Sequence, residues 1–89
     1  MQPFPKLERI MKGTANRHRL KILKLLKTGE YGSEIELAAN LHLHFETTWE
    51  HLRRLVDAGL VFKQRQSINM RHHLTHRGKV VLAFLEKLK

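Results

Sequence analysis

The chain has no cysteine and few prolines or aromatic side chains: its 89 residues include 2 Pro, 1 Trp, 1 Tyr and 4 Phe. Without cysteine, disulfides, thiolate metal ligands and a cysteine nucleophile are all excluded. Long hydrophobic runs are missing as well, since the longest apolar run is Val80 to Leu85. That run is too short for a signal peptide or a membrane-spanning helix. We therefore expect a soluble, cytoplasmic protein with no membrane partner.

Acidic residues are scarce, because 8 Asp and Glu stand against 17 Lys and Arg, for a formal net charge of +9. Such an excess favours a polyanionic partner, since binding to clustered phosphates releases counterions. The excess is uneven along the chain. Residues 1–32 and residues 60–89 each have six more basic than acidic side chains, whereas residues 33–59 have three more acidic ones. The positive charge therefore flanks a central acidic segment.

The sequence shows no pattern of an enzyme. It has no phosphate-binding glycine loop and no spaced set of nucleophile, base and carboxylate. We predict that the protein is not an enzyme and needs no cofactor, and the sequence identifies no small-molecule substrate. A chain of this length forms one domain, residues 1–89, with a small core that a second subunit would help to bury.

Residues 33–58 have the pattern of a helix-turn-helix, with two short helical periods joined by a break. Ser33 is expected to cap the first helix, with Glu36 in the reciprocal position of a capping box. The predicted buried side of this helix consists of Ile35, Leu37, Ala38 and Leu41. The second helix is expected to begin near Phe45 and to end at Ala58-Gly59, where glycine can adopt the left-handed conformation.

The rest of the chain adds terminal helices and a hairpin. The pattern predicts a helix at about 4–12, a helix capped by Thr14, a hairpin at about 60–75 with its tip at 66–69, and a helix at about 76–88 capped by Thr75. The expected fold class is mainly α with a small β-hairpin. It is a winged helix-turn-helix of about five helices plus a two-stranded wing.

The segment E-L-A-A-N-L-H-L-H-F-E-T-T-W-E-H-L-R-R-L-V-D-A-G-L-V, residues 36–61, resembles the core of winged-helix repressors of the arsenical-resistance (ArsR) family. Upstream, T-A-N-R-H-R-L-K-I-L-K-L-L resembles the first core helix of that family. Downstream, V-F-K-Q-R-Q-S-I-N-M-R-H-H-L-T resembles the strands and tip of its wing. The resemblance implies a homodimeric regulator of transcription that binds double-stranded DNA sequence-specifically.

Many members of this family sense metals through cysteines at the start of the helix-turn-helix, or through Asp, His and Glu on the last helix. Residues 31–35 contain no cysteine, and the last helix offers only His76 and Glu86, ten positions apart. His72 and His73 are adjacent on a predicted strand, so their side chains point to opposite faces. At most two histidines could converge there, and we predict no metal site.

The resemblance implies that the second helix of the motif enters the major groove. Thr48, Leu52 and Leu55 should face inward, which leaves an outward side of Phe45, Glu46, Trp49, Glu50 and Arg53. The family usually has small polar and basic residues on this side, and here it is aromatic and acidic. The carboxylates could accept from cytosine N4, the aromatic rings could contact thymine methyl groups, and Arg53 could bind a guanine edge or a phosphate.

Contacts to the DNA backbone are expected from other residues, namely several basic side chains and one hydroxyl. Lys63, Arg65 and Arg71 group near the predicted hairpin tip, Arg17 and Arg19 lie near the start of the second helix, and Thr47 lies near the start of the reading helix. The predicted dimer contact consists of apolar residues on the two terminal helices. These are Phe4, Leu7, Met11, Val80, Phe84 and Leu88.

Two other functions fit the same pattern. The first is a winged-helix module that binds protein through Phe45, Trp49 and the neighbouring carboxylates. The second is a non-specific architectural DNA binder, in which backbone contacts dominate. At single positions, Trp49 could instead be partly buried under the wing, and Glu50 could pair with Arg53 or Arg54. The protein-binding module predicts DNA affinity no better than that of any protein with a charge of +9 and no preference among sequences. Competition with unrelated duplex separates the architectural binder from the sequence-specific regulator.

Overall fold

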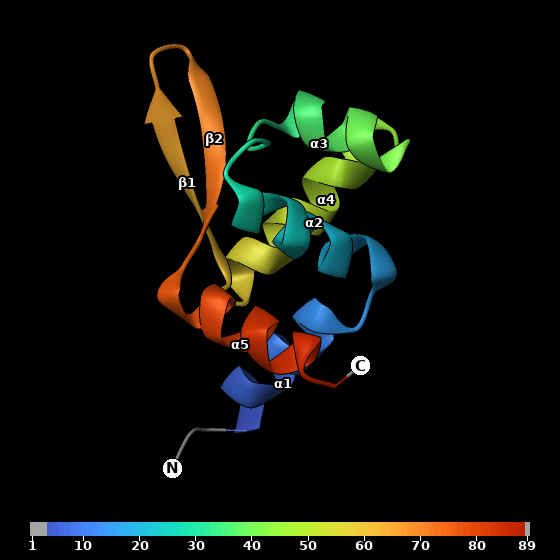
Figure 1. The fold of residues 1–89 in the computed structure, drawn as a ribbon, viewed down its shortest axis with the longest axis vertical. Coiled ribbons are helices and arrows are strands. Elements are labelled where there is room, and N and C mark those ends of the chain that lie inside the picture. Colours follow the sequence, from blue (N-terminus) through green and yellow to red (C-terminus); the bar gives the residue numbers. More distant parts are fainter. Residues whose placement is uncertain (1–3, 89) are drawn as a thin grey trace.

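The computed structural model describes residues 4–88, which form five helices and one two-stranded sheet. In chain order these are α1 (Phe4–Thr14), α2 (Arg17–Thr28), α3 (Glu34–Leu41), α4 (Phe45–Asp57), β1 (Val61–Gln66), β2 (Asn69–Leu74) and α5 (His76–Glu86). Figure 1 shows the hairpin projecting beyond the helices at one end of the molecule, while α1 and α5 lie together at the other end. The predicted winged helix-turn-helix is confirmed.

The junction between α1 and α2 differs from the prediction. Thr14 was expected to cap α2, and this is wrong: it ends α1, where its hydroxyl donates to the Met11 carbonyl at 3.0 Å. Asn16 is the cap, and its Oδ1 accepts from the backbone N–H groups of His18 and Arg19 at 2.9 and 3.2 Å. Thr and Asn both suit the position, and the extended backbone that a cap requires occurs at Asn16.

The helix-turn-helix is capped as predicted. Ser33 Oγ accepts from the Glu36 N–H at 3.1 Å, and Glu36 Oε1 accepts from the Ser33 N–H at 3.1 Å. His42 ends α3 with φ 56°, and Gly59 follows α4 with φ 76°. The expected burial of Ile35 is wrong, because its side chain is 72% exposed. In an eight-residue helix, the face that buries Leu37 and Ala38 leaves position 35 on its flank.

The wing is an antiparallel hairpin in which Val61 pairs with Leu74 and Gln66 pairs with Asn69. Its tip at 66–69 agrees with the prediction. The outer edge of β2 is attached to the loop before α3, because the Gly32 carbonyl accepts from the His72 backbone N–H at 2.8 Å. The His72 ring Nδ1 lies 2.8 Å from the same oxygen. The base of the wing is thereby fixed to the helix-turn-helix.

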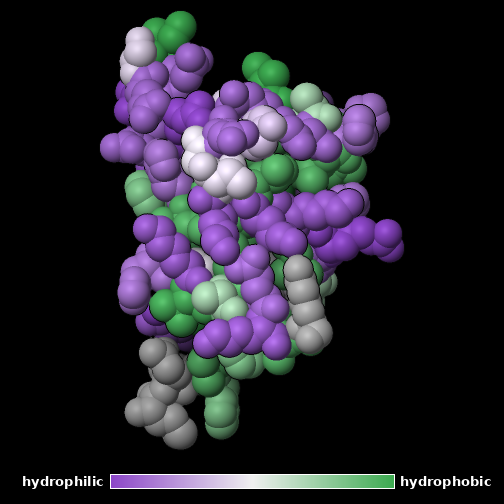
Figure 2. Space-filling model, in the orientation of Figure 1, coloured by the Kyte–Doolittle hydropathy of each residue, from purple (hydrophilic) through white to green (hydrophobic). Residues whose placement is uncertain are grey.

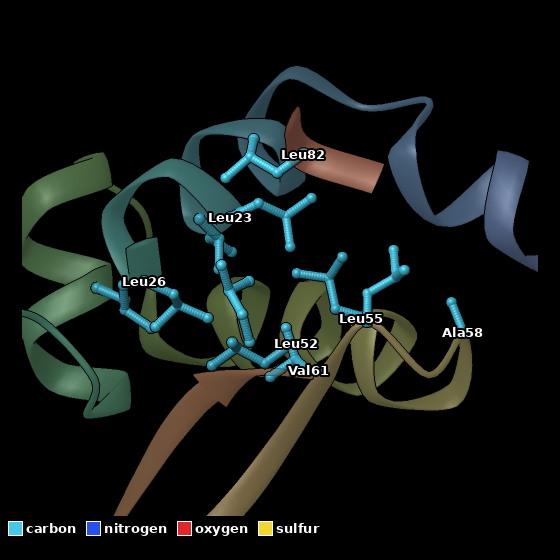
Figure 3. Close-up of a cluster of buried hydrophobic side chains, with 11 residues drawn as sticks. Leu23, Leu26, Leu52, Leu55, Ala58, Val61 and Leu82 are labelled. Carbon is cyan, nitrogen blue, oxygen red and sulfur yellow. The ribbon is translucent and has the colours of Figure 1, made fainter. Parts of the chain in front are cut away.

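The core lies where α2, α4, α5 and the base of the wing meet (Figure 3). It consists of Ile22, Leu23, Leu26, Leu37, Leu52, Leu55, Ala58, Leu60, Val61, Leu74 and Leu82. The first turn of α5 approaches the chain at Leu60 closely enough that a Cβ at Gly78 would lie 2.1 Å from the Leu60 carbonyl oxygen. Among residues 4–88, no helix combines the length and the apolar character needed to cross a bilayer.

Candidate nucleic-acid interface

Helix α4 packs with one side and leaves the other uncovered. Thr48, Leu52 and Leu55 are 0–2% exposed, which confirms the predicted inward side. On the opposite side Phe45 is 50% exposed and Trp49 is 45% exposed. Trp49 is therefore partly buried, and it lines the groove that α4 forms with the wing. The inward side follows from helical spacing, because Thr48, Leu52 and Leu55 recur at i, i+4 and i+7.

An ion-pair network occupies the outer side of α4. Arg53 Nε donates to Glu50 at 3.2 Å, and its NH1 donates to Asp57 at 3.1 Å. Arg54 Nε lies 3.5 Å from the same Glu50 carboxylate. The hydrogen bond from Arg53 lowers the pKa of Glu50, and the same bond raises the pKa of Arg53. Glu50 therefore pairs with both arginines, and Arg53 would have to exchange these partners in order to contact DNA.

A groove of about 150 Å³ separates α4 from the wing, and its lining includes Trp49, Arg53, Lys63 and His72. Lys63 pairs with His72 across the hairpin, and side chains alternate along a strand. Lys63 and Arg65 therefore share the wing face that adjoins α4. Both side chains are exposed. Lys63 lines the groove beside α4, and Arg65 continues the same wing face toward the hairpin tip.

Arg71 lies on a different face of the wing from Lys63 and Arg65. Its partner across the hairpin is Gln64, which places Arg71 on the opposite wing face. There its guanidinium lies over Gly32, and NH1 is 3.4 Å from Glu36 Oε1. Backbone N–H bonds from Gly32 and Ser33 lower the pKa of Glu36, with a further contribution from Arg71. The expected grouping of three wing cations is thus divided by the register of the hairpin.

A second cleft, of about 480 Å³, lies on the other side of α4, where α1 and the start of α2 approach it. Close approach is possible because Gly13 faces Ala58, where an added Cβ would be 3.1 Å from the alanine methyl. The basic lining residues are Arg9, Lys12, Arg19, Arg53 and Arg54. Burial, followed by the charge of Arg54, lowers the pKa of Arg19. No ion pair of residues 4–88 includes Arg9 or Arg19.

Arg9, Lys12 and Arg54 line this cleft and were not among the predicted site residues. The first two lie on α1, away from its apolar Phe4, Leu7 and Met11 side, and helical periodicity could have shown that. Their approach to α4 depends on the Gly13–Ala58 contact, which has no signal in the sequence. Of the remaining predicted residues, Glu46 and Thr47 are exposed in the first turn of α4. Arg17 is exposed at the start of α2 and lines neither groove.

The sequence model of the family described as "Bacterial regulatory protein, arsR family" matches residues 16–63, which is more than half of the chain. The chain belongs to the ArsR family. The match covers α2, both helices of the helix-turn-helix and the start of the wing. The ArsR fold therefore places α4 as the second helix of the motif.

Solved structures agree with the ArsR fold. A homodimeric winged helix-turn-helix DNA-binding domain from Mycobacterium bovis, a possible ArsR-family transcriptional regulator, is 24% identical, with a TM-score of 0.87 over 96% of this chain and 79% of that one. HlyU from Vibrio cholerae is 28% identical, with a TM-score of 0.80 over 94% and 91%. NolR from Sinorhizobium fredii is 23% identical, with a TM-score of 0.81 over 99% and 96%. No curated protein sequence matches the chain.

The wing histidine His72 takes part in a structural contact. The part of the chain that the structure describes contains no group of three or more His, Asp or Glu arranged to hold a metal ion. His72 is buried, and its ring is directed to the Gly32 carbonyl. Burial lowers the pKa of His72. The His72 ring is therefore part of the attachment of the wing.

The predicted dimer residues of this ArsR protein are exposed in the single chain. The exposed fractions are 74% for Phe4, 39% for Leu7, 68% for Met11, 54% for Val80, 60% for Phe84 and 66% for Leu88. Figure 2 shows hydrophobic residues, in green, among hydrophilic ones at the lower end of the molecule, where α1 and α5 lie. Exposed apolar surface on this scale is typical of a protein–protein contact.

Proposed function

We propose that this ArsR-family protein is a transcriptional regulator that binds double-stranded DNA sequence-specifically as a homodimer. The observation that carries the proposal is the position of α4, whose uncovered side lies between two sets of cations without carboxylate partners. Arg9 and Arg19 lie on the side of α1 and α2, and Lys63 and Arg65 lie on the wing. Phosphate contacts on both sides would hold the helix in the major groove between them.

The outward residues of α4 then read base edges. Phe45 and Trp49 are exposed enough to contact thymine methyl groups, and Glu46 has no ion pair among residues 4–88 that would prevent it from accepting from cytosine N4. Glu50 and Arg53 would exchange their mutual hydrogen bonds for contacts to bases. Thr47 is an exposed hydroxyl donor for the backbone, whereas Arg17 is exposed but lines neither groove. Arg71 contributes indirectly, because its contact with Glu36 fixes the wing against α3.

The dimer would form through α1 and α5. Burying Phe4, Met11, Val80, Phe84 and Leu88 against a second copy would remove the largest exposed apolar residues of the terminal helices from water. Two-fold symmetry would then present two α4 helices to half-sites about 34 Å apart. The homodimeric state of the similar domain from Mycobacterium bovis supports this arrangement. A protein with this function acts in the cytoplasm.

Selection of bound fragments from a random pool of DNA duplexes tests the proposal. We expect a pseudo-palindromic consensus with half-sites one helical turn apart. Trp49→Ala and Glu50→Ala should change the consensus, whereas Arg65→Ala should weaken binding to all duplexes to a similar degree. Equal losses on every duplex for all three variants would contradict the assignment of α4 as the reading helix.

A protein-binding module is the second candidate, and one observation favours it. The uncovered side of α4 combines two exposed aromatic rings with Glu46, and Glu50 and Asp57 neutralise Arg53. Such a module predicts DNA affinity no greater than that of any protein with a charge of +9, and no consensus. Tight binding without a consensus would instead indicate a non-specific architectural DNA binder.

A further inference from the structure

A second apolar feature of the structure lies away from the uncovered side of α4. It is a groove of about 720 Å³ between the base of the wing, the end of α2 and α5. Figure 1 shows these three elements converging below the hairpin. The proposed DNA contacts on α2, α4 and the wing do not line this groove. The groove is therefore a separate surface, although it shares the wing and α5 with the proposed DNA and dimer contacts.

The floor and one wall of the groove are apolar. Leu26, Leu74 and Leu82 form the floor and are 6%, 7% and 3% exposed. Phe62 forms a wall and stacks on His73, with ring centroids 5.2 Å apart and planes inclined by 30°. Because Phe62 is 44% exposed, its ring is accessible to a second flat group.

The rim of the groove is positively charged. It carries Lys27, His76, Lys79 and a single carboxylate, that of Glu86. Lys27 Nζ lies 3.0 Å from Glu86 Oε1, so the charges of these two side chains compensate each other. Lys79 takes part in no ion pair of residues 4–88. The groove therefore combines an apolar interior with one uncompensated ammonium group at its edge.

We propose that this groove binds an amphipathic organic monoanion, a flat aromatic body that carries one carboxylate or sulfonate. The aromatic body would lie against Phe62 and the leucine floor, and the acidic group would accept a charge-assisted hydrogen bond from Lys79. The volume is in the range of sites for small organic ligands. The apolar floor offers nothing to a strongly hydrated ion such as inorganic phosphate. A single unpaired ammonium group favours one negative charge over two.

A fluorescent pair of probes that differ in charge tests the site in the intact protein. 1-Anilinonaphthalene-8-sulfonate is an aromatic monoanion, and N-phenyl-1-naphthylamine has the same aromatic skeleton without the sulfonate. We expect the anion to bind with one site per chain. Lys79→Gln should weaken its binding by about five- to tenfold, because a partly exposed charge-assisted bond is lost. The same substitution should leave the affinity of the uncharged probe unchanged.

Matched variants separate the groove from other apolar surface. Lys87→Gln removes a lysine next to the same helix that does not line the groove, and should change neither affinity. Ala83→Trp should fill the groove, and Phe62→Ala should remove its aromatic wall, so both should weaken binding of both probes. Far-UV circular dichroism and a thermal midpoint confirm that each variant is folded.

Three results would overturn the proposal. The first is an equal loss of anion affinity in Lys79→Gln and Lys87→Gln. The second is unchanged binding in folded Ala83→Trp or Phe62→Ala. The third is amide shift changes, in nuclear magnetic resonance spectra of labelled protein, that centre on Val80 and Phe84 instead of Phe62 and His73. Shift changes confined to the groove, together with the loss in Lys79→Gln, would support it.

Discussion

Removal of one wing cation should change the salt dependence of DNA binding by a predictable amount. Four cations per subunit form no ion pair among residues 4–88: Arg9 and Arg19 in the cleft on one side of α4, Lys63 in the groove on the other side, and Arg65 farther along the same wing face. If each neutralises one phosphate, a dimer neutralises eight, and log K should fall against log salt with a slope of about −7. Arg65→Gln removes two of these contacts per dimer. The slope should then be about −5.

Arg71→Gln is the matched control on the same hairpin. Its guanidinium is directed to Glu36 on the opposite wing face, so its removal should leave the slope unchanged. Fluorescence anisotropy of labelled duplex at four or five salt concentrations measures both slopes. An unchanged slope in Arg65→Gln would refute the assignment of the wing face, and so would equal changes in the two variants.

Three further predictions concern stability and assembly. Ser33→Ala should lower the free energy of unfolding by about 1 kcal/mol through loss of the capping box, and an unchanged denaturant midpoint would contradict this. Burial lowers the pKa of His72, so the unfolded chain takes up its proton at a higher pH than the folded protein does. The contribution of His72 to stability should be complete above about pH 6.5 and should decline as the pH falls toward the lower folded pKa. His72→Gln should flatten the decline measured by thermal unfolding, and an identical decline would count against this cause. Phe84→Asp should shift sedimentation from dimer to monomer while Lys24→Asp on α2 does not, and a dimeric Phe84→Asp would exclude the α1/α5 contact.

The elements whose ends are set by local chemistry could be predicted from the sequence. Ser33 and Glu36 form a capping box through contacts within one helical turn, and Gly59 adopts the positive φ that ends α4. The inward side of α4 follows from its spacing alone. Thr14 and Asn16 show the limit of this reasoning. Both can cap a helix, and the choice depends on how far α1 continues before the chain turns.

The candidate interface was only partly predictable, because it depends on register and on packing between distant segments. The sequence placed Lys63, Arg65 and Arg71 near one hairpin, but the register assigns Arg71 to the other face. The approach of α1 to α4 brings Arg9 beside Arg54 and depends on the contact of Gly13 with Ala58. Neither arrangement leaves a local pattern in the chain.

The most direct test of the proposed interface uses Trp49, the single tryptophan of the chain, which lies on the uncovered side of α4 and is 45% exposed. Acrylamide quenching of its fluorescence measures that exposure with and without a duplex selected from the random pool. If α4 enters the major groove of the DNA, saturating DNA should reduce the quenching constant severalfold. Saturated binding with an unchanged quenching constant would show that DNA lies elsewhere on the protein, and would contradict the account.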